Sequence, residues 1–224
     1  MGKKTGTPDP ASGFRILNRE LSLLDFQARV LEEAADSRNP PLERLKFLSI
    51  FGSNMDEFFM VRVSGIKKLK WGRYPDLSPD GLTPRKQLRL IRERALVLYK
   101  QAHFLYRDEI QPQLASAGVH ILNYSKLNVS QHSAVDAYFQ RNVYPVLTPL
   151  VLDSAHPFPH ISNLSLNLAV IIRDTKGGEK FARLKVPETL PRLIHFEDSA
   201  NREQDGSDLK EQYFTWLDQV IVAN

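Results

Sequence analysis

Phe47-Leu-Ser-Ile-Phe-Gly-Ser-Asn-Met-Asp-Glu-Phe-Phe-Met-Val-Arg-Val63 is the stretch from which the fold of this chain can be read. Two apolar runs meet in it at a single polar break, Gly52-Ser53-Asn54. Both runs have a spacing close to that of a helix face. The apolar positions are Leu42, Leu45, Leu48 and Phe51 before the break, and Met55, Phe59, Val63 and Ile66 after it. The pattern predicts two helices that join at a corner.

The residues at the break suit such a corner. Gly52 can end the first helix, because glycine adopts a positive φ without steric cost. Ser53 or Asn54 can cap the second helix by accepting hydrogen bonds from its first amides. Asp56 and Glu57 then lie in the first turn, where the helix dipole favours negative charge. From spacing alone, an ordinary capped helix pair is the simpler interpretation.

Composition narrows the class of protein. The chain has 224 residues, 42% of them hydrophobic, and no cysteine, which excludes disulfides and cysteine-ligated metals. No apolar run reaches membrane-spanning length, and the first residues lack a signal-peptide core. A cytoplasmic protein is therefore expected. A net charge of +4 permits an anionic partner without demanding one.

Helical periodicity extends on both sides of the corner. Residues 1–14 are predicted to be a flexible tail, and a helix is predicted to start near Ser22, with Ser22 and Asp25 as a loose capping box. Its expected buried stripe is Leu21, Leu24, Ala28, Leu31 and Ala35. Thr83 and Pro84 predict the start of a long helix that ends near Pro112. The buried stripe expected for this helix is Leu88, Ile91, Ala95, Leu98, Ala102 and Leu105.

Two basic runs belong to these helices. They are either solvated helix surface or a face for a polyanion, and the sequence leaves both interpretations open. The residues are Lys67, Lys68, Lys70 and Arg73 in the first run, and Arg85, Lys86, Arg89, Arg92, Arg94 and Lys100 in the second.

After Gly118 the period changes from that of a helix to that of a strand. A helix is expected over 130–144, a hairpin at Gly177-Gly178 and a polar loop over 197–210. Strands are expected over 119–122, 164–173, 181–186, 192–196 and 213–216. The predicted class is α+β: an antiparallel helical domain over 15–115, then a small mixed α/β head domain over 118–224. Because the chain stops within an apolar run, we expect the head domain to be truncated.

The residues alone offer little catalysis. There is no P-loop, dinucleotide turn, nucleophile elbow or His-Glu-x-x-His motif. Asp153, His156 and His160 could bind zinc, but they lie in a Pro-rich loop, for which a structural corner is the simpler interpretation. No catalytic residue and no metal ligand is therefore assigned.

Several motifs, in order, resemble the amino-terminal domain and head domain of bacterial polyphosphate kinases. They are Asn18-Arg-Glu-Leu-Ser-Leu-Leu-Asp-Phe26, Arg29-Val-Leu-Glu-Glu-Ala-Ala-Asp36, the Gly52–Glu57 corner and Ala155-His-Pro-Phe-Pro-His-Ile-Ser-Asn-Leu-Ser-Leu-Asn-Leu168. The likeness covers nearly the whole chain after Phe14. It departs from the family at Leu23, where an aromatic is usual, and at Gln27, where asparagine is usual.

The resemblance implies a function. These kinases reversibly move the terminal phosphate of ATP onto polyphosphate, through a phosphohistidine and with magnesium. The reactive histidine and the phosphate-holding arginines belong to later domains, so none of the six histidines here is given that role. The contact with ATP that the resemblance places in this chain is Asn54, whose amide can pair with an adenine edge.

The resemblance also implies partners. A homo-oligomer is expected, with ATP and polyphosphate as ligands, no nucleic acid, and membrane association of a full-length complex left open. The alternative is a non-catalytic oligomerisation or polyanion-binding module. What the gene encodes beyond Asn224 distinguishes the two.

Overall fold

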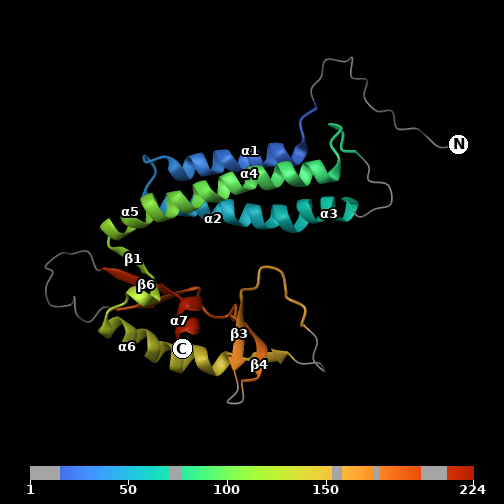
Figure 1. Ribbon diagram of the computed structural model, residues 1–224. Helices are drawn as coiled ribbons and strands as arrows, with labels where there is room; N and C mark the ends of the chain where they lie inside the picture. The colour runs from blue at the N-terminus through green and yellow to red at the C-terminus, as the bar shows by residue number, and fades with distance from the viewer. Residues whose placement is uncertain (1–15, 71–76, 153–157, 174–176, 198–210) are drawn as a thin grey trace. The chain divides into compact units, whose positions relative to one another are not determined.

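A computed structural model describes residues 16–70, 77–152, 158–173, 177–197 and 211–224 (Figure 1). The predicted tail, Asp153, His156 and most of the polar loop lie outside these ranges. The chain divides into two compact units between residues 113 and 114.

The first unit is made of helices. α1 packs against α2 and α4, and α3 packs against α4. Figure 1 shows that the helix formed by α2 and α3 runs antiparallel to both α1 and α4. Within the described part of 16–116 no strand occurs, which confirms the helical class expected here. The elements are α1 (Arg19–Ala35), α2 (Pro41–Glu57), the π-helical η2 (Phe58–Val63), α3 (Ser64–Lys70), α4 (Pro84–Phe104), the π-helical η3 (Leu105–Ile110) and α5 (Gln111–Ser116).

The predicted corner at Gly52 is wrong. One helix, which we call the long helix, runs without interruption from Pro41 to Lys70 through α2, η2 and α3. Gly52 is not among the glycines with positive φ, and Ser53 and Asn54 lie inside α2 instead of capping a new helix. A glycine inside a helix costs about 1 kcal/mol relative to alanine. The apolar packing of a long amphipathic helix offsets a cost of this size.

The π-helical turn changes which side chains of the long helix are buried. A π turn adds one residue to the turn and rotates everything beyond it. Up to the π turn, the buried apolar residues are Phe51, Met55 and Phe58, at ordinary helical spacing. Across the turn, the next buried residue is Val63, after a step of five. Phe58 is 2% exposed, whereas Phe59 is 37% exposed, so the expected burial of Phe59 is wrong.

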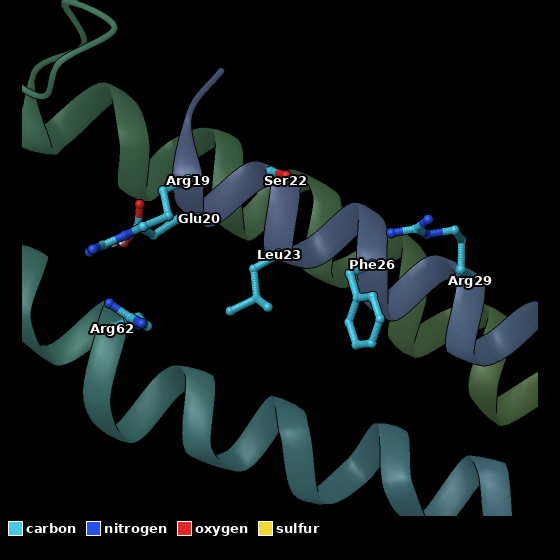
Figure 2. Close-up of a pocket in the computed structure, with 7 residues that line it drawn as sticks. All are labelled: Arg19, Glu20, Ser22, Leu23, Phe26, Arg29 and Arg62. Atoms are coloured by element: carbon cyan, nitrogen blue, oxygen red, sulfur yellow. Dashed lines mark hydrogen bonds and ion pairs between the residues drawn. The ribbon is translucent and has the colours of Figure 1, made fainter. Parts of the chain in front are cut away.

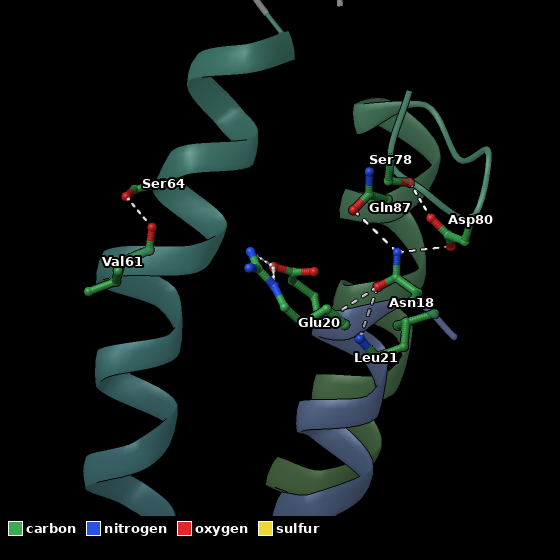
Figure 3. Close-up of polar contacts among 9 residues, drawn as sticks. Asn18, Glu20, Leu21, Val61, Ser64, Ser78, Asp80 and Gln87 are labelled. Atoms are coloured by element: carbon green, nitrogen blue, oxygen red, sulfur yellow. Dashed lines mark hydrogen bonds and ion pairs between the residues drawn. The ribbon is translucent and has the colours of Figure 1, made fainter. Parts of the chain in front are cut away.

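The start of α1 is held by Asn18, not by Ser22 as predicted. The Asn18 Oδ1 accepts hydrogen bonds from the backbone amides of Glu20 and Leu21, both at 3.1 Å. Its Nδ2 donates to Asp80 Oδ2 at 3.0 Å and to Gln87 Oε1 at 3.3 Å (Figure 3). One side chain thus caps α1 and ties it both to the loop before α4 and to α4 itself.

The buried stripe of α1 differs from the predicted one at three of its five positions. Leu24 and Leu31 are buried as expected, but the other three buried residues each precede the predicted one: Glu20 for Leu21, Gln27 for Ala28 and Ala34 for Ala35. Gln27 is 3% exposed, which is unusual for an amide side chain. Its burial depends on a partner from another helix, which a single-helix pattern does not contain.

α4 confirms its predicted start, and the helical segment that it begins ends shortly after Pro112, as expected. Thr83 accepts a hydrogen bond from the amide of Lys86 at 3.3 Å, as expected for a cap. Helical structure continues past Pro112 to Ser116. Pro112 is tolerated because it occupies the second position of α5, directly after the π-helical η3, where the regular ladder is already broken.

Arg44 of the long helix is buried at the far end of α1. It is 0% exposed, and its guanidinium donates to Ala34 O at 2.7 Å. It also donates to Gln113 Oε1 at 2.8 Å and to Glu109 Oε2 at 2.6 Å. A buried cation paired in this way ties α1, the long helix and the end of η3 together.

The second unit contains two three-stranded sheets, in the orders β1-β6-β5 and β2-β4-β3. β1 and β6 are parallel, and all other neighbours are antiparallel. The elements are β1 (Val119–Leu122), η4 (Tyr124–Lys126), α6 (Val129–Tyr138), η5 (Phe139–Val143), η6 (Tyr144–Val146), β2 (Pro149–Leu152), β3 (Asn167–Arg173), β4 (Glu179–Lys185), β5 (Leu193–Phe196), β6 (Gln212–Trp216) and α7 (Leu217–Ala223).

The core of this unit lies where its helices meet the sheets. Val135, Phe139 and Val143 are buried on one side of α6 and η5, as the helical spacing predicts. They join Ile194 of β5 and Leu217 of α7 in one apolar cluster. The α+β class is therefore confirmed, and β3 and β4 form the expected antiparallel pair. β2 has no counterpart among the expected strands.

In the ranges that the structure covers, no helix is both long enough and apolar enough to cross a membrane.

Candidate functional site

A groove lies between α1 and the long helix in the first unit. It consists of two adjoining cavities of about 250 and 280 Å³ that share Leu23, Phe26 and Arg62 as walls. Figure 2 shows Leu23 and Phe26 projecting from α1 toward the long helix, with Arg62 on the opposite wall. Each cavity approaches the lower end of the range of about 300–1,000 Å³ that is usual for small-molecule sites.

Asn54 lines one of these cavities. It is half-buried, and its Nδ2 donates a hydrogen bond to the Oε1 of Gln27 at 3.1 Å. The sequence predicted Asn54 as a ligand contact at a helix corner. The structure instead places it on a straight helix, where it faces α1 across the groove. A helix positions an amide more rigidly than a loop does.

The other walls carry aromatic, cationic and acidic side chains, the acidic ones being Glu20 and Glu57. Phe26 is 46% exposed, and the Arg29 guanidinium carbon lies 5.6 Å from the centroid of its ring. Arg19 is engaged by Glu20, with 2.9 Å between Nη2 and Oε1. Arg62 forms no ion pair or hydrogen bond with any described residue through its side chain, although it lines both cavities.

The wall of the cavity beside Asn54 is one face of the long helix. Phe58, Val61 and Arg62 belong to η2 and line the same cavity as Asn54. They follow Asn54 by four, seven and eight residues, which is the spacing of one helix face.

The sequence singled out Asn54, which lines a cavity, but did not indicate Gln27, Phe26 and Arg62 as its neighbours there. Phe26 and Gln27 lie in the Asn18–Phe26 motif and directly after it, so the motif itself was the available signal. Arg62 lies eight residues after Asn54, on the same helix face, and this spacing would have indicated it if an uninterrupted helix had been expected. His160, the one described member of the zinc hypothesis, belongs to no metal-ligating cluster within the described residues.

The fold and the groove together indicate the class of protein. It is a two-unit α+β protein whose helical unit carries a groove lined by amide, aromatic, guanidinium and carboxylate groups. The family models for "Polyphosphate kinase N-terminal domain" and "Polyphosphate kinase middle domain" match residues 16–122 and 130–224. The chain belongs to the polyphosphate kinase family and carries the two domains that these descriptions name.

Individual relatives agree with this assignment. The chain is 50% identical over 181 residues to polyphosphate kinase of Mycobacterium avium, which covers 80% of this chain and 25% of the relative. It is 43% identical over 218 residues to polyphosphate kinase of Mycobacterium ulcerans, covering 97% of this chain and 29% of the relative. The chain therefore spans between a quarter and three tenths of these relatives' length.

A solved structure has the same fold. The crystal structure of polyphosphate kinase from Porphyromonas gingivalis superimposes with a TM-score of 0.77 at 27% identity. The match covers 94% of this chain and 30% of that chain. Both units of the fold are therefore found in a polyphosphate kinase.

Proposed function

We propose that this chain supplies the adenine-side contact of an enzyme that reversibly transfers the terminal phosphate of ATP to polyphosphate through a phosphohistidine. In this proposal Asn54 bonds the adenine, and the reactive histidine lies in domains that the relatives have and this chain does not contain. The protein works in the cytoplasm as a homo-oligomer.

The observation that carries the proposal is the position of Asn54 in a groove with Phe26 and Arg62. An amide offers hydrogen bonds to the edge of a base, and an exposed aromatic ring offers a face on which a base can stack. An unpaired guanidinium attracts phosphate oxygens. These three groups are the parts that a nucleotide requires. Asn54 and Arg62 lie on the wall formed by the long helix, and Phe26 lies on the opposite wall, formed by α1.

Magnesium is implied by the family for the complete reaction. In the ranges that the structure describes, no three His, Cys, Asp or Glu side chains gather as a metal site would require. We propose that the groove contacts the base of the nucleotide.

The first test is nucleotide binding by this chain. ATP is titrated against wild type, Asn54→Ala and Ser53→Ala, with melting temperature recorded for each. A lost neutral hydrogen bond is worth about 0.5–1.5 kcal/mol, so Asn54→Ala should weaken ATP binding by up to roughly tenfold. Ser53 is exposed and lines neither cavity, so Ser53→Ala should change neither quantity.

Two results would contradict this proposal. One is an Asn54→Ala protein that melts earlier but binds ATP with unchanged affinity, since Asn54 would then serve only to pack α1 on the long helix. The other is a wild-type chain that does not bind ATP.

The second test is catalysis. Phosphoryl transfer needs a nucleophile and a cationic clamp on the moving phosphate. None of the residues that line the groove is a histidine. We expect the purified chain to make no polyphosphate from ATP, and turnover above a contaminant control would refute this expectation.

A further inference from the structure

The strand β3, in the second unit, has one edge that no described strand pairs with. The order of its sheet is β2-β4-β3, so β4 lies along one side of β3 and the other side is the margin of the sheet (Figure 1). Apart from the ladder with β4, no backbone hydrogen bond from a described residue reaches Asn167–Arg173. Backbone groups on this side can therefore bond a further strand.

This edge lacks the features that usually prevent strands from pairing between molecules. Such features are a short strand, a proline, a lysine or a bulge. The other edge strands, β1, β2 and β5, have four residues each, and β2 begins with Pro149. β3 has seven residues, none of which is proline, glycine or lysine, and its register with β4 skips no residue. Among the described strands, β3 is the longest at a sheet edge.

The side chains of β3 are apolar although several of them face solvent. Leu168–Ile172 is a run of five apolar residues. Within it, Val170, Ile171 and Ile172 are 37%, 63% and 42% exposed. Pairing along this edge would remove part of this surface from water, which favours association.

The sequence of β3 is complementary to itself when two copies run antiparallel. A two-fold axis that joins two such sheets into one has to oppose residues of the same face, so it passes through a residue and not between two. With the axis at Val170, the opposed pairs are Val170 with itself, Ala169 with Ile171, Leu168 with Ile172, and Asn167 with Arg173. Apolar residues then meet apolar residues, polar residues meet polar residues, and no like charges are opposed.

Moving the axis by one residue destroys this match. With the axis at Ala169, the amide of Asn167 lies opposite Ile171, and with the axis at Ile171, Arg173 lies opposite Ala169. Each alternative opposes a polar and an apolar side chain. The register centred on Val170 is therefore the favoured one. The charge of Arg173 is also compensated within its own sheet, because its Nε lies 2.8 Å from Glu179 Oε1.

We propose that the outer edge of β3 is the surface through which two copies of this chain associate, forming one six-stranded sheet in the order β2-β4-β3-β3-β4-β2. A two-fold contact uses this edge once in each copy, so assembly stops at the dimer. The inference rests on the homo-oligomer of the proposed function and names its interface. One strand pair is small beside a standard interface of about 1,600 Å², so the dimer should depend on protein concentration.

Single cysteines test the register, because the chain contains no cysteine of its own. Directly opposed residues of antiparallel strands have Cβ atoms about 4.5–5.5 Å apart, near the separation that a disulfide bridges. Val170→Cys opposes itself across the axis, so mild oxidation should link two copies covalently. Ile172→Cys is the control on the same strand and face, with similar exposure. Its two copies would be about 13 Å apart along the strands and should stay unlinked.

Charged substitutions test the strength of the contact. Sedimentation velocity of the wild type at rising concentration should show the 25.6 kDa chain converting to a species of twice that mass. Ile171→Lys places two cations diagonally across the axis and should weaken the dimer at least about tenfold. Val222→Lys, at a 71% exposed position of α7, should leave it unchanged.

A mixture of variants separates this effect from misfolding. Combining Ile171→Lys with Ile171→Glu brings opposite charges together across the axis, so association should return toward the wild-type level. Melting temperatures establish that each variant is folded.

The outcomes separate the interface from the oligomer. A wild-type dimer that Ile171→Lys leaves unchanged, or an Ile172→Cys chain that links as readily as Val170→Cys, overturns the role of β3 and leaves the homo-oligomer in place. A wild type that stays monomeric at every concentration overturns both. The proposed ATP contact of Asn54 has its own titration and is affected by neither result.

Discussion

Arg44 and Arg62 lie on the same long helix, but their surroundings are opposite. Arg44 is fully buried, and its guanidinium donates to a backbone carbonyl, an amide oxygen and a carboxylate. Arg62 is exposed, lines both cavities of the groove, and pairs with no described side chain. At the Arg44 end of the helical unit, a buried and fully hydrogen-bonded guanidinium joins the helices. At the Arg62 end, a groove lies between α1 and the long helix.

The two guanidinium groups differ in what they can bind: that of Arg44 is bonded within the protein, and that of Arg62 is exposed to solvent. A buried guanidinium has to be paired within the protein, because water does not reach it. An exposed guanidinium in a groove keeps its bonding capacity for a ligand. We infer that the Arg44 end holds the helices at a fixed separation and that the Asn54 end uses this separation to present a site.

We expect the largest loss in the free energy of unfolding from a substitution at Arg44. Arg44→Met leaves Glu109 and the Ala34 carbonyl without their partner, and removing one partner of a buried ion pair costs about 3–5 kcal/mol. The matched change at the other end, Arg62→Met, should alter the free energy of unfolding by no more than about 0.5 kcal/mol. Urea denaturation of both variants measures the contrast, and equal losses would remove the distinction between the two ends.

A smaller effect is expected at the start of α1, beside the Arg62 end. Asn18→Ala removes the cap of α1 and the links to Asp80 and Gln87, and a lost cap costs about 0.5–2 kcal/mol. Ser22→Ala, at the residue that local pattern favoured as the cap, should cost almost nothing. Chemical denaturation of the pair decides between them, and a larger loss from Ser22→Ala would refute the assignment.

The smallest effect concerns the basic runs on α3 and α4. Lys67, Lys68 and Lys70 are exposed in the last turn of α3, which packs beside α4. Exposed charges act weakly and are screened by salt. Labelled polyphosphate should bind weakly at low ionic strength and dissociate as salt rises, and charge-neutralising Lys→Gln changes in this turn should reduce that binding.

Two results would limit this expectation. If polyphosphate does not bind at low salt, the basic runs are solvated helix surface. If binding persists in high salt, a built site is responsible rather than diffuse charge, and Arg62→Met then tests whether the groove is that site.

Local pattern was sufficient for several of the regular elements, although not for β2 or for the uninterrupted long helix. Helical spacing identified the stripe of α4 through Ile91 and Leu98, and the change of period identified β1 at Val119. These signals work because a helix face and a strand face repeat at different intervals along the chain. The motif around Asn54 also identified the family, since the order of several motifs is a property of the sequence itself.

The tertiary structure decided which side chains those elements bury and present. No local rule places a π turn after Glu57, yet at this turn the next buried residue after Phe58 is Val63, five residues on, and Phe59 is left exposed. Gln27 is buried because Asn54 on another helix bonds it. Whether a π turn forms or an amide is buried depends on small energy differences that neighbouring side chains set. Packing between helices therefore decides these features, and the order of residues along one helix does not.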